Sequence, residues 1–435
     1  MQYSIKCVIA KRYRYECSSG QHVFAILESK QTLMSSGSIF RKPILWVAAL
    51  GYFVDIYDLL LFSIIRIPSL ADLGVTDSGD TGLLILNTQM FGLLLGGILW
   101  GIMGDKLGRT RVLFLSIALY SIGNVLNGFV QTPMQYAWIR FFTGIGLAGE
   151  LGAGITLVSE LLPKEKRGIG TSVVAGVGLT GAVLAFFIAQ WFDWRTCYFI
   201  GGGLGLALLL LRMSVFESGL YHKMSAQHHI VKGNFLMLFN KRERFMRYLR
   251  SILIGLPTWF VVGILISFSP EFAKQMGITE PIEPGIGIMI SYSAIAVGDV
   301  IIGLLSQYLQ SRKKAMHAFY IITMLGMLLF FTAGGELQMY IAIGIMGFGT
   351  GFWAVFVTIG AENFGTNLRA TAATTIPNMV RGSLNGITAL FLLLQGSLSY
   401  VHSGIATAVV VMCITYWAIS GLQETFGRDL DFIEE

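Results

Sequence analysis

At 435 residues, the chain is 54% hydrophobic and 13% charged, so its polar side chains are too few to cover a soluble globule of this size. This composition excludes an ordinary soluble enzyme or binding domain and indicates that lipid surrounds most of the folded chain. The net charge of +6 alone would be compatible with nucleic acid. Its basic residues gather between apolar runs, as in cytoplasmic loops, so we expect no nucleic-acid partner.

Taken in chain order, the sequence begins with a mixed, polar stretch at 1–42, which predicts a cytoplasmic tail rather than a cleavable signal peptide. Met34 is an alternative start, because the first apolar run follows soon after it. Runs of about 20 apolar residues predict helices that cross a bilayer. The first such runs lie at 43–67, 81–104, 111–130, 134–160, 168–191 and 194–215.

A polar and basic stretch at 216–250 follows and predicts a cytoplasmic linker. Further apolar runs lie at 251–272, 284–310, 315–334, 337–363, 371–397 and 402–423, before a short tail at 426–435. The sequence therefore predicts an all-α membrane protein with twelve transmembrane helices. They form two six-helix halves, an N-terminal bundle at 43–215 and a C-terminal bundle at 251–425.

The distribution of lysine and arginine predicts the orientation, because positive residues collect on the cytoplasmic side. With both termini in the cytoplasm, 26 of the 31 Lys and Arg residues fall in cytoplasmic segments, including those from Arg212 to Arg250. Arg66, Arg195 and Lys274 would face outside. We therefore expect a multi-pass protein of the inner or plasma membrane.

The two halves share spaced residues at a constant offset of 202, which indicates an internal repeat. The pairs are Glu160 with Glu362, Arg167 with Arg369, Gly101 with Gly303 and Leu107 with Leu309. Duplicated helical bundles place their substrate path between the repeats, near mid-membrane. We therefore expect the functional site between the halves.

The loop between the second and third runs reads GIMGDKLGRTR at 101–111 and resembles the signature loop of the major facilitator superfamily. Its glycines permit a tight turn, and Asp105 can pair with a base or cap a helix. The resemblance implies a conformational latch, although a basic loop could also serve topology alone. The latch candidates are Gly101, Asp105, Gly108 and Arg109, with Glu160, Arg167, Glu362 and Arg369.

Two further segments resemble the metabolite:proton symporter and sugar-porter branches of that superfamily. They are 51–58 in the first run, and 140–152 with 160–168 in and after the fourth. Ile56 and Ala148 depart from the branch pattern, where an aromatic residue and a glycine are usual. The resemblance covers about residues 43–425 and implies the fold and transport activity of the superfamily, without identifying a substrate.

Charged residues within apolar runs cost roughly 2.5 to 3.5 kcal/mol at a helix centre, so they are functional candidates. The acids Asp55, Asp58, Glu150 and Asp299 are candidates for proton coupling. The alternatives are structural ion pairs and helix caps. Arg140 and Glu150 are ten residues apart on one helix, so each is expected to pair with another helix.

The candidates for substrate binding are Tyr57, Arg140, Trp259, Trp353 and Arg381. Arg381 is the expected cation for an anionic substrate. The resemblance would place Trp259 and Trp353, on the seventh and tenth runs, beside the central cavity. The alternative for both tryptophans is a place in the hydrophobic core.

The sequence contains no metal-ligand spacing and no catalytic constellation, and its glycine fingerprints lie within apolar runs. We therefore expect neither an enzyme nor a bound cofactor or metal. The favoured function is proton-coupled symport of a small polar metabolite, such as an organic acid, by alternating access. An exporter or uniporter of the same fold remains open, as does a membrane receptor with a transporter-like body.

Overall fold

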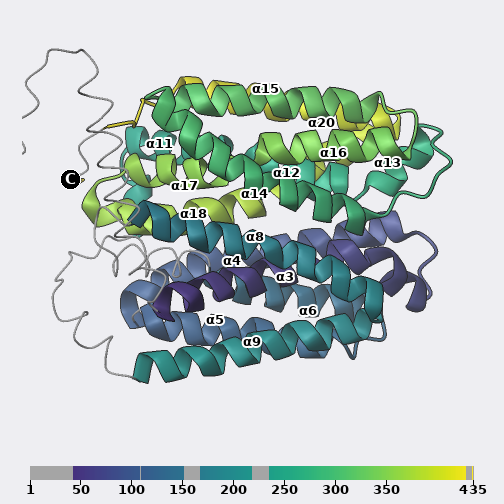
Figure 1. The fold of residues 1–435 in the computed structure, drawn as a ribbon, viewed down its shortest axis with the longest axis horizontal. Helices are drawn as coiled ribbons and strands as arrows, with labels where there is room; N and C mark the ends of the chain where they lie inside the picture. Colours follow the sequence, from purple (N-terminus) through teal and green to yellow (C-terminus); the bar gives the residue numbers. More distant parts are fainter. Residues whose placement is uncertain (1–42, 108, 151–166, 218–234, 428–433, 435) are drawn as a thin grey trace, which may run out of the picture.

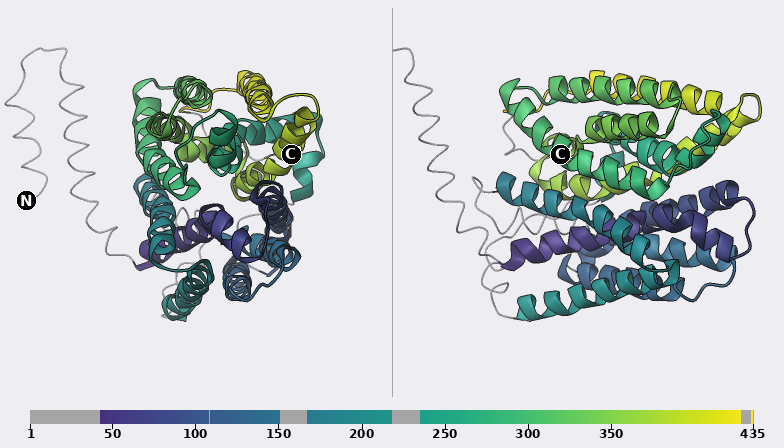
Figure 2. Two further views of the ribbon diagram at one scale, coloured as in Figure 1. Left: turned by 90° about the vertical axis from the view of Figure 1, so that its right-hand side faces the viewer. Right: turned by 45° about the vertical axis from the view of Figure 1, so that its right-hand side comes forward.

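The computed structural model describes residues 43–107, 109–150, 167–217, 235–427 and 434. All regular structure in these ranges is helical. The helices run along the long axis of the molecule in two groups, the earlier helices below and the later ones above in Figure 1. The end-on view in Figure 2 shows the same two groups side by side. The expected all-α architecture is confirmed.

The described residues of the first group form six helices, which correspond to the first six apolar runs. They are α3 (Pro43–Asp72), α4 (Ser78–Leu107), α5 (Arg109–Asn127), α6 (Pro133–Leu147), α8 (Arg167–Trp191) and α9 (Trp194–Glu217). Helix α3 packs along α8 and α9, while α6 packs along α4 and α5. The part of the fourth run beyond Glu150 lies outside the described residues.

The second group contains more breaks than the first. Its elements are η2 (Phe235–Phe239), α11 (Arg242–Leu253), α12 (Leu256–Phe260), η3 (Val261–Ile266), α13 (Ser269–Gln275), α14 (Pro284–Tyr308), α15 (Arg312–Phe331), α16 (Glu336–Thr350), α17 (Trp353–Glu362), α18 (Thr366–Gly382), α19 (Leu384–Gln395) and α20 (Tyr400–Ser420). Residues 242–250, expected in the linker, belong to α11. Its buried Tyr248 packs against Phe364, and this contact favours helix over a loose connection.

Nine of the described helical stretches are long and apolar enough to cross a membrane. With α5, the described part of the fourth pass and the α18–α19 pair, they match the twelve expected spans. Large apolar side chains such as Leu210, Leu304 and Leu393 are about two-thirds or more exposed. Their position on the outside of a helical bundle is typical of a surface that faces lipid.

Three of the expected continuous spans are interrupted in the structure. The seventh changes from α to π geometry over η3, where the Ser267 amide donates to the Val262 carbonyl five residues earlier. The tenth breaks at Gly351 and Phe352 between α16 and α17, and the eleventh is divided at Ser383 into α18 and α19. Interrupted membrane helices are tolerated where protein or a cavity covers the backbone. The breaks in the seventh and tenth spans lie at buried positions, and Ser383 is partly buried.

The two groups meet along α4 with α18 and along α8 with α14. The α4–α18 contact is close because a Cβ on Gly97 would meet the Asn378 side chain at 2.7 Å. Asn378 donates across this interface to the Ala148 carbonyl at 2.8 Å. The central site lies between these two contacts.

Candidate functional site

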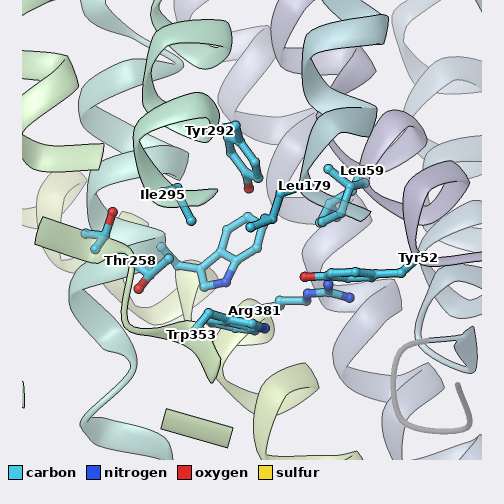
Figure 3. A pocket seen from close by; sticks show the side chains of 11 residues that line it. Tyr52, Leu59, Leu179, Thr258, Tyr292, Ile295, Trp353 and Arg381 are labelled. Atoms are coloured by element: carbon cyan, nitrogen blue, oxygen red, sulfur yellow. The ribbon is translucent and has the colours of Figure 1, made fainter. Parts of the chain in front are cut away.

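A small pocket lies between the two groups of helices, as expected from the repeat (Figure 3). Its lining residues are Tyr52, Ile56 and Leu59 of α3, Leu179 of α8, Thr258 and Trp259 of α12, Tyr292 and Ile295 of α14, Thr350 of α16, Trp353 of α17 and Arg381 of α18. The centre of a water molecule has about 20 Å³ of free space there, and one water needs roughly 10–15 Å³ by that measure. The free space at this point between the halves is therefore too small for an organic substrate.

Arg381 is the cation of this pocket and is 1% exposed. Its Nη2 atom lies 3.4 Å from Oδ2 of Asp55 on α3, so the pair joins the two halves. The contact is incomplete, because Arg381 Nε and Nη1 and Asp55 Oδ1 are buried without a hydrogen-bond partner among the described residues. A buried ion pair with unmet hydrogen bonds is costly. The arrangement therefore leaves Arg381 able to accept a further anion.

Three of the five expected substrate-binding residues line the pocket: Trp259, Trp353 and Arg381. The indole Nε1 atoms of both tryptophans are buried without a hydrogen-bond partner. In Figure 3 the Trp353 indole lies near the Arg381 guanidinium, with Tyr52 beside it, and Trp259 lines the same pocket. Two aromatic faces, two N–H donors and one cation suit a flat molecule that carries an anionic group.

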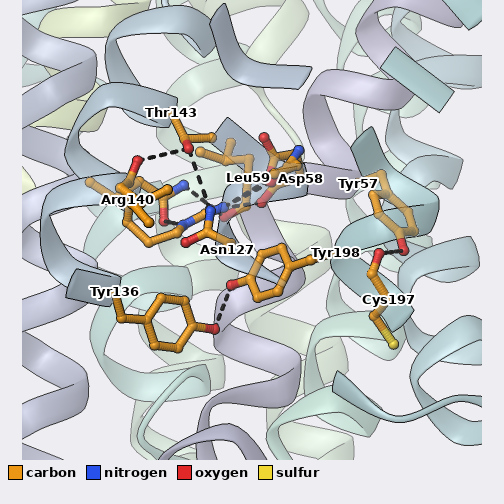
Figure 4. Close-up of polar contacts among 12 residues, drawn as sticks. Tyr57, Asp58, Leu59, Asn127, Tyr136, Arg140, Thr143, Cys197 and Tyr198 are labelled. Carbon is orange, nitrogen blue, oxygen red and sulfur yellow. Dashed lines mark hydrogen bonds and ion pairs between the residues drawn. The ribbon is translucent and has the colours of Figure 1, made fainter. Parts of the chain in front are cut away.

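The other two expected residues, Arg140 and Tyr57, are absent from the pocket lining and lie inside the first helical group (Figure 4). Tyr57 donates to the Cys197 carbonyl at 2.9 Å. Arg140 Nη1 lies 2.8 Å from Asp58 Oδ1, and its Nη2 donates to the Asp58 carbonyl at 3.0 Å. Arg140 also donates to Gln89 and lies over the Tyr198 ring. Arg140 and Asp58 are fully buried, so this pair is built into one half.

Glu150 pairs with Arg212 of α9, and both side chains are 1% exposed. Arg212 Nη1 donates to Glu150 Oε2 at 3.1 Å, and Nη2 also contacts the Glu150 carboxylate. Gly51 of α3 makes room, because a Cβ there would lie 2.1 Å from both partners. Arg140 and Glu150 therefore each pair with another helix, as expected. Sequence reasoning placed Arg212 in a cytoplasmic segment and missed this partner, although Arg212 ends an apolar run.

Asp299 of α14 is 8% exposed and lies outside the pocket lining. Its Oδ1 atom accepts from the Ala354 amide at 2.9 Å, at the start of α17. Its Oδ2 atom is buried without a partner. The structure therefore places the four acidic candidates at three kinds of location: Asp55 at the interface, Asp58 and Glu150 in pairs inside one half, and Asp299 at a helix N-terminus.

The family model of the Major Facilitator Superfamily matches residues 48–398, which is most of the chain. The chain belongs to the major facilitator superfamily. Its members carry small molecules across membranes, so this protein is a multi-pass membrane transporter and not an enzyme. The expected resemblance is confirmed.

Individual relatives and a solved structure match between about three quarters and nine tenths of the chain. The niacin transporter NiaP of Acinetobacter baylyi is 24% identical over 443 residues, which cover 91% of this chain and 96% of that protein. The cis,cis-muconate transport protein of the same organism is 26% identical over 350 residues, or 77% and 83% of the two chains. The structure of the proton:xylose symporter XylE matches with a TM-score of 0.64 at 16% identity, covering 89% and 97%, and shows the same fold.

The structure does not describe the side chains, or in two cases the backbone, of most residues proposed for the latch. Gly108 and Glu160 lie outside the described backbone, and nothing is described of the side chains of Asp105, Arg109 and Arg167. Gly101 lies on α4 and is half-buried. A Cβ added at Gly101 would lie 3.6 Å from the Thr375 side chain. In the second half, Glu362 pairs with Arg312 at 3.4 Å, and Arg369 is half-buried on α18. The latch stays a prediction.

A second ion pair joins the halves at the end of the molecule where α3 leads into α4. Arg66 of α3 is 1% exposed and binds Glu271 of α13 through both carboxylate oxygens, at 2.7 and 3.0 Å. Arg66 also donates to the Ser267 carbonyl and lies over the Phe268 ring. Sequence reasoning missed Glu271 because it stands at the end of the apolar run at 251–272, where a charge is ordinarily exposed to water. Because this cluster joins α3 to α13 at that end, we expect it to limit access to the pocket from there.

Changing Glu271 to glutamine is expected to open this end more often, because the neutral amide loses the charge-assisted bonds to Arg66. In a protein without its native cysteines, Leu59→Cys would report access to the pocket. We expect about tenfold faster reaction with a polar maleimide added from the Arg66 side, equivalent to ~1.4 kcal/mol. The control is Asp72→Asn, which breaks the exposed Asp72–Arg195 pair within one half. Equal labelling in all three proteins would contradict a closing role for Arg66 and Glu271.

Proposed function

We propose that this chain is a proton-coupled symporter that carries a small planar carboxylate by alternating rocking of its two halves. The observation that carries the proposal is the incomplete Asp55–Arg381 pair, which joins the halves at the wall of the aromatic pocket. The XylE likeness supports the fold of the carrier but supplies no substrate or coupling ion.

The substrate class follows from the groups around the pocket. Arg381 offers two unpartnered nitrogens, and Trp259 and Trp353 each offer an unpartnered indole N–H. A carboxylate accepts such bonds, and Arg binds it through two parallel contacts. The aromatic walls suit a flat, unsaturated body. Two relatives carry niacin and cis,cis-muconate by name, and both are small unsaturated carboxylic acids.

Coupling follows from competition for Arg381. An ionised Asp55 occupies one side of the guanidinium, and a substrate carboxylate needs the same cation. When Asp55 takes a proton, it no longer holds Arg381 by charge, and the substrate can bind there without leaving an unpaired anion in the membrane. One proton and one monocarboxylate then cross together, and the loaded site carries the same net charge as the empty one.

The same pair explains why the empty carrier can return. After substrate and proton leave, Asp55 and Arg381 again neutralise each other, so the empty site carries no exposed charge through the closed state. A half-loaded carrier, with a proton but no substrate, would leave Arg381 uncompensated. That state is disfavoured, and proton leak is suppressed.

The orientation proposed with this function places both termini in the cytoplasm and the Arg66–Glu271 pair outside, in an inner or plasma membrane. The two carrier halves correspond to residues 43–215 and 251–425, with α11 extending the second half back to Arg242. The residues from 216 to the start of α11 connect the halves, and 1–42 and 426–435 are proposed as cytoplasmic tails.

The test is uptake of radiolabelled nicotinate into vesicles that contain the purified protein. With the vesicle interior alkaline, we expect accumulation above the external concentration, abolished by a proton ionophore and unchanged by a potassium-diffusion potential. Protein-free vesicles correct for passage of the neutral acid through lipid. Nicotinamide, which has the same ring without the negative charge, should not accumulate.

The alternatives give different results in the same vesicles. Equilibration of nicotinate without accumulation would indicate a uniporter, and extrusion under the pH gradient an exporter. Saturable binding without passage would indicate a receptor. If nicotinate, benzoate and cis,cis-muconate neither bind nor cross, the carboxylate proposal is wrong.

A further inference from the structure

The discontinuity of the tenth span brings a buried acid to the edge of the pocket. Helix α16 ends at Thr350, and α17 begins at Trp353 with two residues between them. The residue before α17, Phe352, makes no side-chain cap. The first amides of a helix need acceptors, and inside a membrane no bulk water supplies them. An acceptor must therefore come from a neighbouring helix.

Asp299 of α14 supplies that acceptor, since its Oδ1 atom lies 2.9 Å from the Ala354 amide nitrogen. The approach depends on two glycines. A Cβ on Gly298 would lie 2.5 Å from the Phe348 carbonyl, and one on Gly351 would lie 2.8 Å from the Gly298 Cα. The two backbones therefore touch where α16 breaks, and this contact brings Asp299 to the N-terminus of α17.

The capped helix begins with a pocket residue. Trp353 is the first residue of α17 and lines the pocket, with its Nε1 atom buried and unpartnered. On α14, Ile295 lines the pocket and Asp299 stands four residues further along the same helical face. Asp299 thus holds the backbone from which the Trp353 indole projects, while lying outside the lining itself.

We propose that Asp299 is a positioning residue for Trp353, which fixes the indole N–H and ring face against the substrate, and that it carries no transported proton. The identity of the substrate in this proposal rests on the proposed function. The contact between Asp299 and the Ala354 amide is independent of that function. The negative carboxylate suits the positive end of α17, and its second oxygen needs no proton exchange for this role.

Two substitutions separate positioning from proton carriage. In Asp299→Asn the side-chain oxygen still accepts from Ala354, but the amide cannot take up and release a proton. In Asp299→Ala the acceptor is lost. We expect the asparagine variant to keep the nicotinate KM within about twofold and to accumulate nicotinate fully under a pH gradient. The alanine variant should raise KM about tenfold. Loss of accumulation with exchange retained in Asp299→Asn would overturn the proposal, even if the alanine variant does not fold.

A double-mutant cycle tests whether Asp299 acts through Trp353. Nicotinate Kd is measured for Asp299→Ala, Trp353→Ala and the double variant. If Asp299 acts by positioning the indole, its loss adds little once the indole is gone, and the double variant should bind like Trp353→Ala. If the fold increases in nicotinate Kd of the two single variants multiply in the double variant, the proposal is overturned. The matched control is Ser399→Ala, which removes the cap of α20, where Ser399 accepts from the His402 amide at 3.3 Å, away from the pocket lining.

A measurement without ligand keeps this proposal separate from the symport proposal. The emission of Trp353 is the difference between the spectra of a protein and its Trp353→Phe derivative. We expect this difference spectrum to shift to longer wavelength in Asp299→Ala, as the indole leaves its fixed buried position, and to stay unchanged in Asp299→Asn and Ser399→Ala. An unchanged spectrum in Asp299→Ala would overturn the positioning role. Failure of the wild-type protein to bind nicotinate would overturn the symport proposal alone.

Discussion

Replacing Arg381 with alanine is expected to weaken nicotinate binding at least about 100-fold and to abolish its transport. Arg381 is the cation in the pocket lining, and two of its nitrogens have no hydrogen-bond partner in the part of the chain that the structure describes. Hydrogen bonds to charged groups are worth about 1.5 to 3 kcal/mol each, and a carboxylate would form at least two of them. The measurement is equilibrium binding to the purified protein, followed by uptake in vesicles.

Arg381→Lys separates charge from geometry, since lysine keeps the charge but cannot form two parallel bonds. We expect it to restore part of the binding and little of the transport. Arg250→Gln is a matched control on α11, because Arg250 donates to the Gly421 carbonyl away from the pocket lining. Nicotinate binding by a folded Arg381→Ala protein at wild-type affinity would show that the substrate anion binds elsewhere.

Changing Asp55 to asparagine is expected to uncouple transport. The amide keeps the size of the side chain but cannot carry a proton, so Arg381 is always free for the substrate. Exchange of nicotinate at equal concentrations on both sides should continue, while accumulation driven by a pH gradient should fall to the level of protein-free vesicles. The nicotinate KM should also lose its dependence on pH, because binding no longer waits for protonation.

Asp58→Asn provides the comparison, because Asp58 stands one helical turn away and is bound to Arg140 within one half. Removing one partner of a buried pair costs about 3–5 kcal/mol, so this variant should unfold at lower temperature and lose exchange and accumulation together. Full gradient-driven accumulation by Asp55→Asn would rule out Asp55 as the coupling acid.

The sequence was sufficient to predict the membrane class and the spans, because each span leaves a long apolar run. It also identified the charges in the middle of the spans, such as Asp55, Arg140 and Arg381, since each stands out against an apolar background. It could not assign their partners. Asp55 and Arg381 are 326 residues apart, and Asp55 and Asp58 pair with different helices although they are three residues apart. Such choices depend on helix packing, which no local pattern records.

The helix breaks were missed for a related reason. Residues 337–363 read as one apolar span, and Gly351 is one of many glycines in it. What interrupts the helix is the close approach of Gly351 to Gly298 and the acceptor on Asp299, and both come from another span. Arg212 and Glu271 were missed because each stands at the end of a run, where a charge is ordinarily exposed to water.

The π-helical turn in the seventh span has a consequence for how the two ends of that span move. Segment η3 separates Trp259 in the pocket from Glu271 at the closing cluster, and every residue in it is buried. A π turn holds one more residue than an α turn, and each residue of an α-helix accounts for about 100° of rotation. If η3 adopts α-helical bonding, the chain beyond it rotates by about that angle, which takes the Glu271 carboxylate away from Arg66 while Trp259 keeps its place. A change in hydrogen-bond register over six residues can thus break the Arg66–Glu271 pair without moving Trp259 in the pocket.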